Sequence, residues 1–224
     1  SSAIAIYNYS IPNIHMSRPK FWRNNKAVLL VILSFFILDA VIWSFILFPK
    51  NGNNELELYF LNVGQGDSQL LNFPDDVQVL IDGGPANGKV LSELSEILPL
   101  NDRYIDLVIM THPQADHFGG LIEILKNYEV GMFIGNGRKG EAKSYEDLKE
   151  IIVSKKIPYL ALGEGYKIKH QSNVLSILSP NLNELLSAEF NDTSLVITLE
   201  HNGLNALYTG DIGFNVESRL AKDY

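Results

Sequence analysis

The stretch "MTHPQADHFGG" (residues 110–120) decides how the rest of the sequence is interpreted. It places His112, Asp116 and His117 within six residues, between two apolar runs that read as a strand and a helix. Secondary-structure elements that flank a loop can hold His and Asp side chains in the fixed geometry that a cation requires. Because Asp116 and His117 are adjacent at the expected start of a helix, the loop predicts a metal-binding or catalytic site.

Several other loops end an expected strand with a polar side chain beside glycine or a turn. They are "GQGD" with Asp67, "DGG" with Asp82, "NDTS" with Asn191 and Asp192, and "TGD" with Asp211. Each Asp taken alone is more often a turn former that bonds to its own backbone. The chain has no cysteine, so a cation would be held by imidazole, carboxylate and amide groups, which suit zinc, manganese or iron. The isolated histidines are expected to be surface or core residues: His15, His170 and His201.

The distribution of apolar residues predicts an alternation of short strands and helices in the second part of the chain. Strands are expected at 55–63, 68–73, 77–81, 105–110, 131–134, 157–160, 167–170, 174–178, 194–200 and 204–209. Helices are expected at 91–98, 116–127, 145–154 and from 214. Strands come first in hairpins and are then mixed with helices. This order predicts two sheets with helices outside, an α/β sandwich over residues 56–224.

Residues 27–48 form an apolar run that, as a helix, would span ~33 Å, about one bilayer core. Its single charge, Asp39, costs roughly 2.5–3.5 kcal/mol near the bilayer centre, and the apolar residues of the run offset that cost. We expect a transmembrane helix followed by a linker at 49–55. The alternative is a buried helix of a soluble protein. Because Asp39 should not face lipid, we expect further transmembrane helices of the same protein before Ser1.

Charge is distributed unevenly along the chain. The net charge is −8, but residues 1–50 carry +4, so the remainder carries −12. Basic residues precede the apolar run, and the positive-inside rule therefore places residues 1–26 in the cytoplasm and residues 49–224 outside the cell membrane. An acidic domain is a poor general binder of nucleic-acid phosphates. If phosphates are its substrate, a bound metal must supply most of the local positive charge.

The motifs taken together resemble a known family. "HPQADHFGGL" is similar to the His-rich loop of the metallo-β-lactamase superfamily, and "FLNVGQGDSQLL", "VLIDGG", "NDTSLVITL" and "LYTGDI" follow the same order. Over about residues 56–220 the sequence resembles the C-terminal extracytoplasmic domain of the bacterial competence membrane proteins that internalise DNA. The resemblance implies a metallo-β-lactamase-like αββα sandwich with one or two metal ions at its edge.

The resemblance also implies roles for individual residues. His112 would be a ligand of the first metal, Asp116 and His117 would belong to the second, and Asp211 would bridge both. Asp82 would support the His loop. Zinc is the expected metal, with manganese as the alternative.

The sequence departs from the family pattern at three places. Gln114 stands where the family has a second His or an Asp, and an amide oxygen is a weak ligand for zinc. The third loop, which commonly offers His, has Asn191 and Asp192. The chain ends at "ESRLAKDY", before the family's downstream "HHGS"-type loop, so we expect a sequence truncated at its C-terminus. Metal-binding or supporting roles stay open for Asp82, Gln114, Asn191 and Asp192.

The function that the resemblance implies is metal-assisted hydrolysis, with Asp116 orienting the attacking water or accepting its proton. The family favours a phosphodiester, DNA, as substrate. One alternative is a catalytically impaired binding or assembly domain of a DNA-uptake channel, which Gln114 and the missing loop favour. Another is a membrane-tethered hydrolase of small molecules, which the charge of −12 slightly favours.

Overall fold

The computed structural model describes residues 25–47 and 55–224, which fall into two compact units divided near residue 51. The first unit contains the helix α1 (Asn25–Leu47). Its segment Lys26–Ser44 has a mean hydropathy of 2.5 and is long and apolar enough to cross a membrane. The predicted apolar helix is therefore present. Most of the predicted N-terminal segment and linker, with the basic residues Arg18, Lys20, Arg23 and Lys50, lies outside the described residues.

The second unit contains two sheets. The first has the order β1-β2-β3-β4-β5-β6 and the second the order β10-β9-β8-β7. The strands of the first sheet are β1 (Glu57–Phe60), β2 (Gln69–Phe73), β3 (Val77–Ile81), β4 (Tyr104–Ile109), β5 (Glu129–Gly135) and β6 (Tyr159–Ala161). Those of the second are β7 (Lys167–His170), β8 (Asn173–Ser179), β9 (Val196–His201) and β10 (Leu204–Tyr208). The pairs from β3 to β6 are parallel, and all other pairs are antiparallel.

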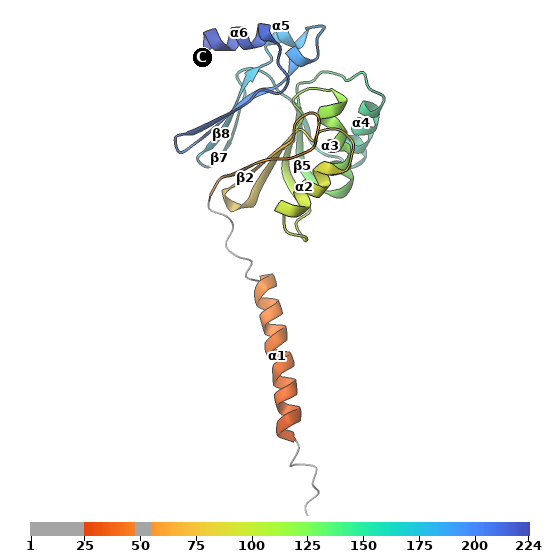
Figure 1. Cartoon of the computed structure of the whole chain (residues 1–224), viewed down its shortest axis with the longest axis vertical. Coiled ribbons are helices and arrows are strands. Elements are labelled where there is room, and N and C mark those ends of the chain that lie inside the picture. The colour runs from red at the N-terminus through yellow and green to blue at the C-terminus, as the bar shows by residue number, and fades with distance from the viewer. Residues whose placement is uncertain (1–24, 48–54) are drawn as a thin grey trace, which may run out of the picture. The chain divides into compact units, whose positions relative to one another are not determined.

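Three helices cover the outer face of the first sheet, and the second sheet covers its inner face (Figure 1). These helices are α2 (Lys89–Ile97), α3 (Ala115–Asn127) and α4 (Ser144–Ser154). One apolar cluster fills the space between helices and sheet, and a second fills the space between the sheets. Two more helices, α5 (Leu182–Leu185) and α6 (Phe214–Asp223), lie beside the second sheet. The predicted two-sheet sandwich with helices outside is confirmed.

Several element boundaries differ from those predicted. The first strand ends at Phe60 instead of residue 63, because the backbone N–H of Val63 bonds to the carbonyl of Leu61 and turns the chain out of the ladder. β6 begins at Tyr159 because Ile157 still bonds to the end of α4. β9 begins at Val196, since the N–H of Ser194 closes a short 3-10 turn over Asn191–Thr193.

The short elements Pro74–Asp76, α5 and Asn191–Thr193 were not predicted from the sequence. Each has three or four residues, too few for a helical period to be visible. By contrast, the "NG" dipeptide at 202–203 predicts a tight hairpin turn between β9 and β10. Asn202 and Gly203 both have positive φ there, as the tight hairpin turn requires.

Candidate metal centre

The site forms where the carboxyl ends of the parallel strands meet the start of α3. Asp82 follows β3 directly, and Thr111 and His112 follow β4. His117 lies in the first turn of α3. The fold therefore brings together residues from positions that are far apart in the sequence, as sheets of this kind do at their carboxyl edge.

Glycine makes the close approach of these loops possible. A Cβ atom added at Gly120 would lie 2.0 Å from the carbonyl oxygen of Gly83, and one at Gly83 would lie 2.7 Å from the backbone nitrogen of Leu121. Any larger residue would push α3 away from the loop after β3.

Backbone hydrogen bonds join three of the loops directly. The N–H of Gly83 donates to the carbonyl of His117 over 2.8 Å, and the N–H of Gly120 donates to Gly84 over 2.9 Å. The N–H of Gly84 donates to the carbonyl of Asp67, also over 2.9 Å. The loop after β1, the loop after β3 and the start of α3 are thus held together by their main chains.

Asp82 is the buried centre of the hydrogen-bond network. Its Oδ1 accepts the backbone N–H of Thr111 at 2.7 Å, and its Oδ2 accepts the Thr111 hydroxyl at 2.6 Å. Oδ2 also lies 2.9 Å from Nδ1 of His117. The residue is buried, and its φ of 54° is a left-handed conformation that Asp tolerates better than most residues. With its oxygens engaged in this way, Asp82 supports the two histidines.

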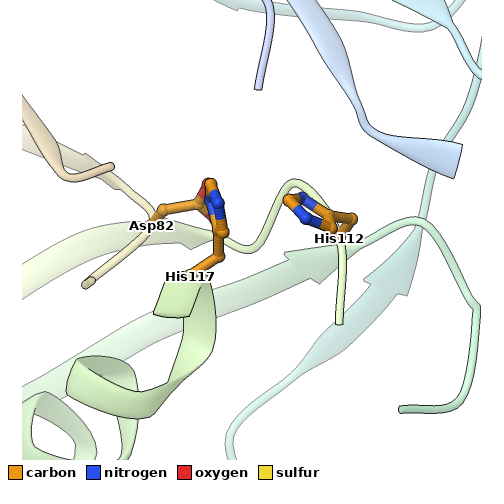
Figure 2. Close-up of side chains that lie close together, drawn as sticks. All are labelled: Asp82, His112 and His117. Carbon is orange, nitrogen blue, oxygen red and sulfur yellow. The ribbon is translucent and has the colours of Figure 1, made fainter. Parts of the chain in front are cut away.

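The network fixes which nitrogen of each histidine is free. Because the Thr111 hydroxyl gives its hydrogen to Asp82, its oxygen can accept Nδ1–H of His112, which lies 3.0 Å away. Nδ1–H of His117 donates to Asp82. Both Nε2 atoms are buried and have no hydrogen-bond partner among the described residues. The arrangement, shown in Figure 2, leaves the two Nε2 atoms as the positions at which a metal could bind.

The two imidazoles lie close together and have opposite pKa shifts. Their ring centroids are 4.2 Å apart, and neither residue has exposed surface. Burial, together with the neighbouring charge of His117, lowers the pKa of His112, so it is neutral at pH 7. Burial alone would lower the pKa of His117 too, but the hydrogen bond to Asp82 and the nearby carboxylates raise it to about 9. A cation that binds Nε2 of His117 must therefore displace a proton.

Two groups of candidate ligands share His117. The first is Asp82, His112 and His117, all buried. The second is Asp67, His117 and Asp211, on the more open side of the site. Within each group the ligand atoms lie within 4.8 Å of one another. Oδ2 of Asp211 is 3.4 Å from Nε2 of His117, and the Asp211 side chain is 39% exposed.

The remaining predicted site residues lie around these groups but belong to neither. Oδ2 of Asp116 accepts a hydrogen bond from Nε2 of Gln65 at 3.1 Å. Gln114 donates from Nε2 to Oδ1 of Asn191 at 2.6 Å. Asp192 accepts the hydroxyl of Ser187 at 3.2 Å.

Two residues that position the site were not singled out from the sequence. Thr111 links Asp82 to His112, and a Thr before a His carries no distinctive signal. Asn136 is buried and donates to the carbonyls of Thr111 and Thr193, at 3.3 and 2.7 Å. Its place in "GNG" directly after β5 is the one signal that could have identified it. Asp67, by contrast, was noticed at a strand end but not assigned a ligand role.

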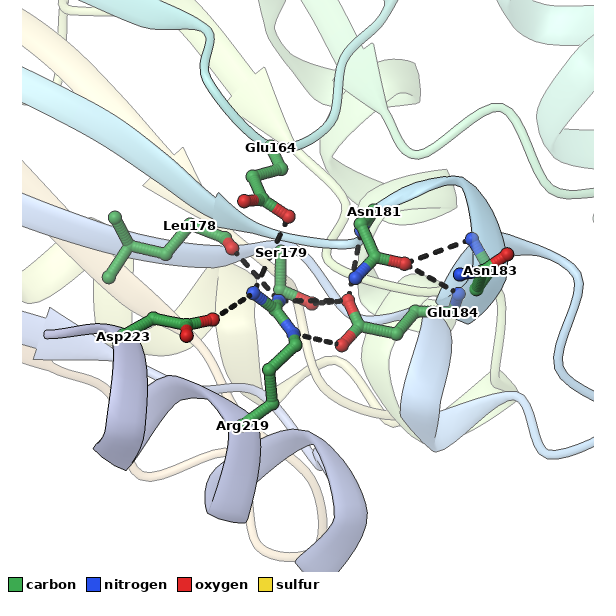
Figure 3. Close-up of polar contacts among 8 residues, drawn as sticks. All are labelled: Glu164, Leu178, Ser179, Asn181, Asn183, Glu184, Arg219 and Asp223. Carbon is green, nitrogen blue, oxygen red and sulfur yellow. Dashed lines mark hydrogen bonds and ion pairs between the residues drawn. The ribbon is translucent and has the colours of Figure 1, made fainter.

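The loop that carries Asp211 leads into α6, which is anchored through one arginine (Figure 3). Arg219 donates from Nε to Oε1 of Glu184 at 2.6 Å and from Nη2 to Oε2 at 3.0 Å. Nη2 also donates to the carbonyl of Leu178 at 3.2 Å. Glu184 in turn completes a capping box with Asn181 at the start of α5. Val216 is the one buried residue of α6, so the hydrogen bonds of Arg219 are a main attachment of the helix.

Most of the folded unit is similar to known proteins. The sequence profile of the Metallo-beta-lactamase superfamily matches residues 61–223. ComE operon protein 3 of Bacillus subtilis (strain 168) is 28% identical, over 71% of this chain and 22% of that protein. The chain thus spans about a fifth of that relative's length.

Solved structures with a similar fold include two metalloproteins. Igni18, a metallo hydrolase from Ignicoccus hospitalis, is 18% identical, with a TM-score of 0.46 over 71% of this chain and 62% of that one. CmlA, a diiron β-hydroxylase from Streptomyces venezuelae, is 14% identical, with a TM-score of 0.48 over 76% and 32%.

Proposed function

Because the chain belongs to the metallo-β-lactamase superfamily, we propose that residues 55–224 form a metal-dependent hydrolase. One observation carries the proposal: Nε2 of His112 and Nε2 of His117 are buried, close together and without hydrogen-bond partners among the described residues. A buried polar atom without a partner is costly, and such atoms require an explanation. A divalent cation bound by both nitrogens would satisfy them.

The donor set fits such a cation. Imidazole nitrogen and carboxylate oxygen bind zinc and manganese, and the described residues around the site offer both. The support of His117 by Asp82 is the arrangement typical of metal-binding histidines. A bound cation would supply an activated water nucleophile at neutral pH and stabilise the negative charge that develops during hydrolysis.

The protein groups around the cation would hold the imidazoles in place and accept protons. Asp82 and Thr111 hold the imidazoles so that Nε2 points away from the supporting carboxylate. Asp116 is held by Gln65 and lies partly exposed in the first turn of α3. There it is suited to accept a proton from the attacking water.

We propose a phosphodiester, DNA, as substrate and a membrane as the location of the protein. The relationship to ComE operon protein 3 and the competence-type motifs support the substrate, and the apolar helix α1 supports the location. The charge of −12 on residues 51–224 requires that the cation attract the phosphate. The proposed orientation has residues 1–26 in the cytoplasm and residues 49–224 outside.

Metal-dependent hydrolysis can be tested with the full chain in detergent. After treatment with a chelator, the chain is reloaded with zinc or manganese and assayed on single-stranded DNA and on bis(p-nitrophenyl) phosphate. Hydrolysis should require the metal and be lost in His112→Gln and His117→Gln. His201→Asn is the control, because His201 lies at the β9–β10 turn and bonds to Asn173. Hydrolysis that persists in both site variants would refute the proposal.

A second function is favoured by the hydrogen bond between Gln114 and Asn191. By the family resemblance, Gln114 stands at a ligand position and Asn191 lies in the loop that commonly offers His. Here the two side chains bond to each other over 2.6 Å. The domain would then bind a partner or DNA without turnover. Metal binding and DNA binding without hydrolysis of any diester would select this alternative. Hydrolysis of small esters but not of DNA would select a small-molecule hydrolase.

A further inference from the structure

The loop "GQGD" at 64–67 packs against the start of α3, although the two are about fifty residues apart in sequence. Gly66 has a φ of 72°, and a Cβ atom there would lie 1.9 Å from the carbonyl oxygen of Asp116. Gln65 donates to the Asp116 carboxylate, and the carbonyl of Asp67 accepts the N–H of Gly84. The loop is therefore held on both sides of Gly66, at Gln65 and at Asp67. The fold thus sets the direction of the Asp67 side chain.

The Asp67 carboxylate faces His117 and Asp211. One ligand atom from each of these three residues lies within 4.8 Å of the others. His117 contributes a buried Nε2 that is 3.4 Å from Asp211 and has no hydrogen-bond partner among the described residues. The space between these atoms is thus bordered by one nitrogen donor and two carboxylates.

Asp67 does not behave as an ordinary turn former. An Asp that stabilises its own turn accepts a hydrogen bond from a nearby backbone N–H. In the part of the chain that the structure describes, no donor hydrogen-bonds to the Asp67 carboxylate. The nearest Asp67 and Asp211 carboxylate oxygens lie within 4.8 Å of each other, so the two negative charges repel. A cation between the three side chains would remove the repulsion between the carboxylates.

We propose that Asp67 is a metal ligand and completes a three-residue site with His117 and Asp211. The inference rests on the proposed function, since it assigns a ligand to the same metal centre. These three side chains would give the metal two oxygen ligands and one nitrogen ligand. A fourth coordination position would remain open for water or substrate, as in catalytic zinc sites. The loop would then have two roles: Asp67 binds the metal, and Gln65 holds Asp116 next to it.

Asp67→Asn tests the proposal, because it removes the charge and preserves the size of the side chain. Glu123→Gln is the control: it removes one charge from α3, and its amide oxygen can still accept the N–H of Gly88. The full chain in detergent is freed of metal, and ZnCl2 and MnCl2 are titrated calorimetrically into each variant. Affinity should fall at least roughly tenfold in Asp67→Asn, the lower end of what losing a partner of a ligand costs. It should be unchanged in Glu123→Gln.

Cobalt provides a readout that a purely structural role would not change. The visible spectrum of the Co2+-loaded chain reports ligand number and type, and it should differ between the unmodified chain and Asp67→Asn. If Asp67→Asn does not fold, Asp67→Glu retains the carboxylate and should bind metal with an altered spectrum. Equal affinity and identical spectra in the unmodified chain and the Asp67 variant would overturn the inference but leave the proposed function standing. No metal binding by the unmodified chain would overturn both.

Discussion

The two sides of the candidate metal centre differ in how the protein holds them. On the buried side, Asp82, Thr111 and His112 have almost no exposed surface and are joined by hydrogen bonds of 2.6–3.0 Å. On the open side, Asp67 and Asp211 are partly exposed and come from loops. The buried side is fixed by the core strands, whereas the open side depends on contacts between loops and on the attachment of α6. Damage to the first should affect folding, and damage to the second should mainly affect metal binding.

The largest effect is expected from Asp82→Asn on the buried side. An amide cannot accept all three donors that now reach Asp82, and its own NH2 group would face one of them. Losing one partner of a buried charged network costs roughly 3–5 kcal/mol. The free energy of unfolding, measured with urea on the full chain in detergent, should fall by this amount.

Asp75→Asn is the matched control for this change. Asp75 also has a positive φ, 64°, but it is exposed. If Asp82→Asn and Asp75→Asn unfolded at the same urea concentration, the proposed difference between the buried and open sides would be wrong.

A smaller loss of stability is expected from Arg219→Met, which detaches α6 from Glu184 and Leu178. Hydrogen bonds to charged groups contribute roughly 1.5–3 kcal/mol, and the pair is partly buried. Metal affinity should fall as well, because the loop with Asp211 precedes the helix. Lys222→Met, on the same helix but exposed, should change neither quantity. Unchanged metal affinity in Arg219→Met would show that α6 does not position Asp211.

Acid should also distinguish Arg219→Met from the unmodified chain. Burial would raise the pKa of Glu184, but the hydrogen bonds from Arg219, the Asn181 backbone and Ser179 hold it below 4.5. A carboxyl whose folded pKa is depressed stabilises the protein above its unfolded value, and this stability is lost as the pH falls through the folded value.

One proton changes the free energy of unfolding by at most about 1.4 kcal/mol per pH unit. Melting temperatures measured from pH 7 to pH 3 should therefore fall less steeply below pH 4.5 in Arg219→Met than in the unmodified chain. Parallel curves would contradict the role assigned to this pair.

The smallest change in stability is expected from Gln114→His. This variant adds a possible metal ligand to the buried side of the site. The variant loses one hydrogen bond, to Asn191, at a cost of about 0.5–1.5 kcal/mol. It gains an imidazole beside His112, so zinc affinity should rise. Gln114→Met removes the same hydrogen bond without adding a ligand and should not bind zinc more tightly. Equal zinc affinity in the two variants would show that this position does not face the metal.

Much of the fold could be predicted because its strands and helices carry periodic apolar patterns. Residues 107–110 at the end of the parallel strand β4 are all apolar, and "NG" at 202–203 marks the hairpin turn. The boundaries were missed where a backbone hydrogen bond decides them, as at Val63 and Ser194. Such bonds depend on which segments meet in space, and the local sequence does not record this.

The site residues show the same difference between local sequence patterns, which could be predicted, and long-range contacts, which could not. His112 and His117 stand five positions apart, in the loop before α3 and in its first turn, so a local motif was enough to predict their proximity. The approach of Asp67 to His117 depends on Gly66 fitting against the backbone of Asp116. The sequence shows a glycine there, but not the segment that it contacts. Long-range contacts of this kind explain why a ligand role for Asp67 became visible in the structure alone.

The main-chain bonds that join the loops at 67, 84 and 117–120 have a consequence for the motion of the site. Loop amides normally exchange their hydrogens with solvent quickly, because small local openings expose them. The amides of Gly83, Gly84 and Gly120 donate to carbonyls of other loops, in the same way as residues in a sheet. They should exchange as slowly as the amides of β3 and β4, with or without metal. The metal would then bind to a frame that is already rigid.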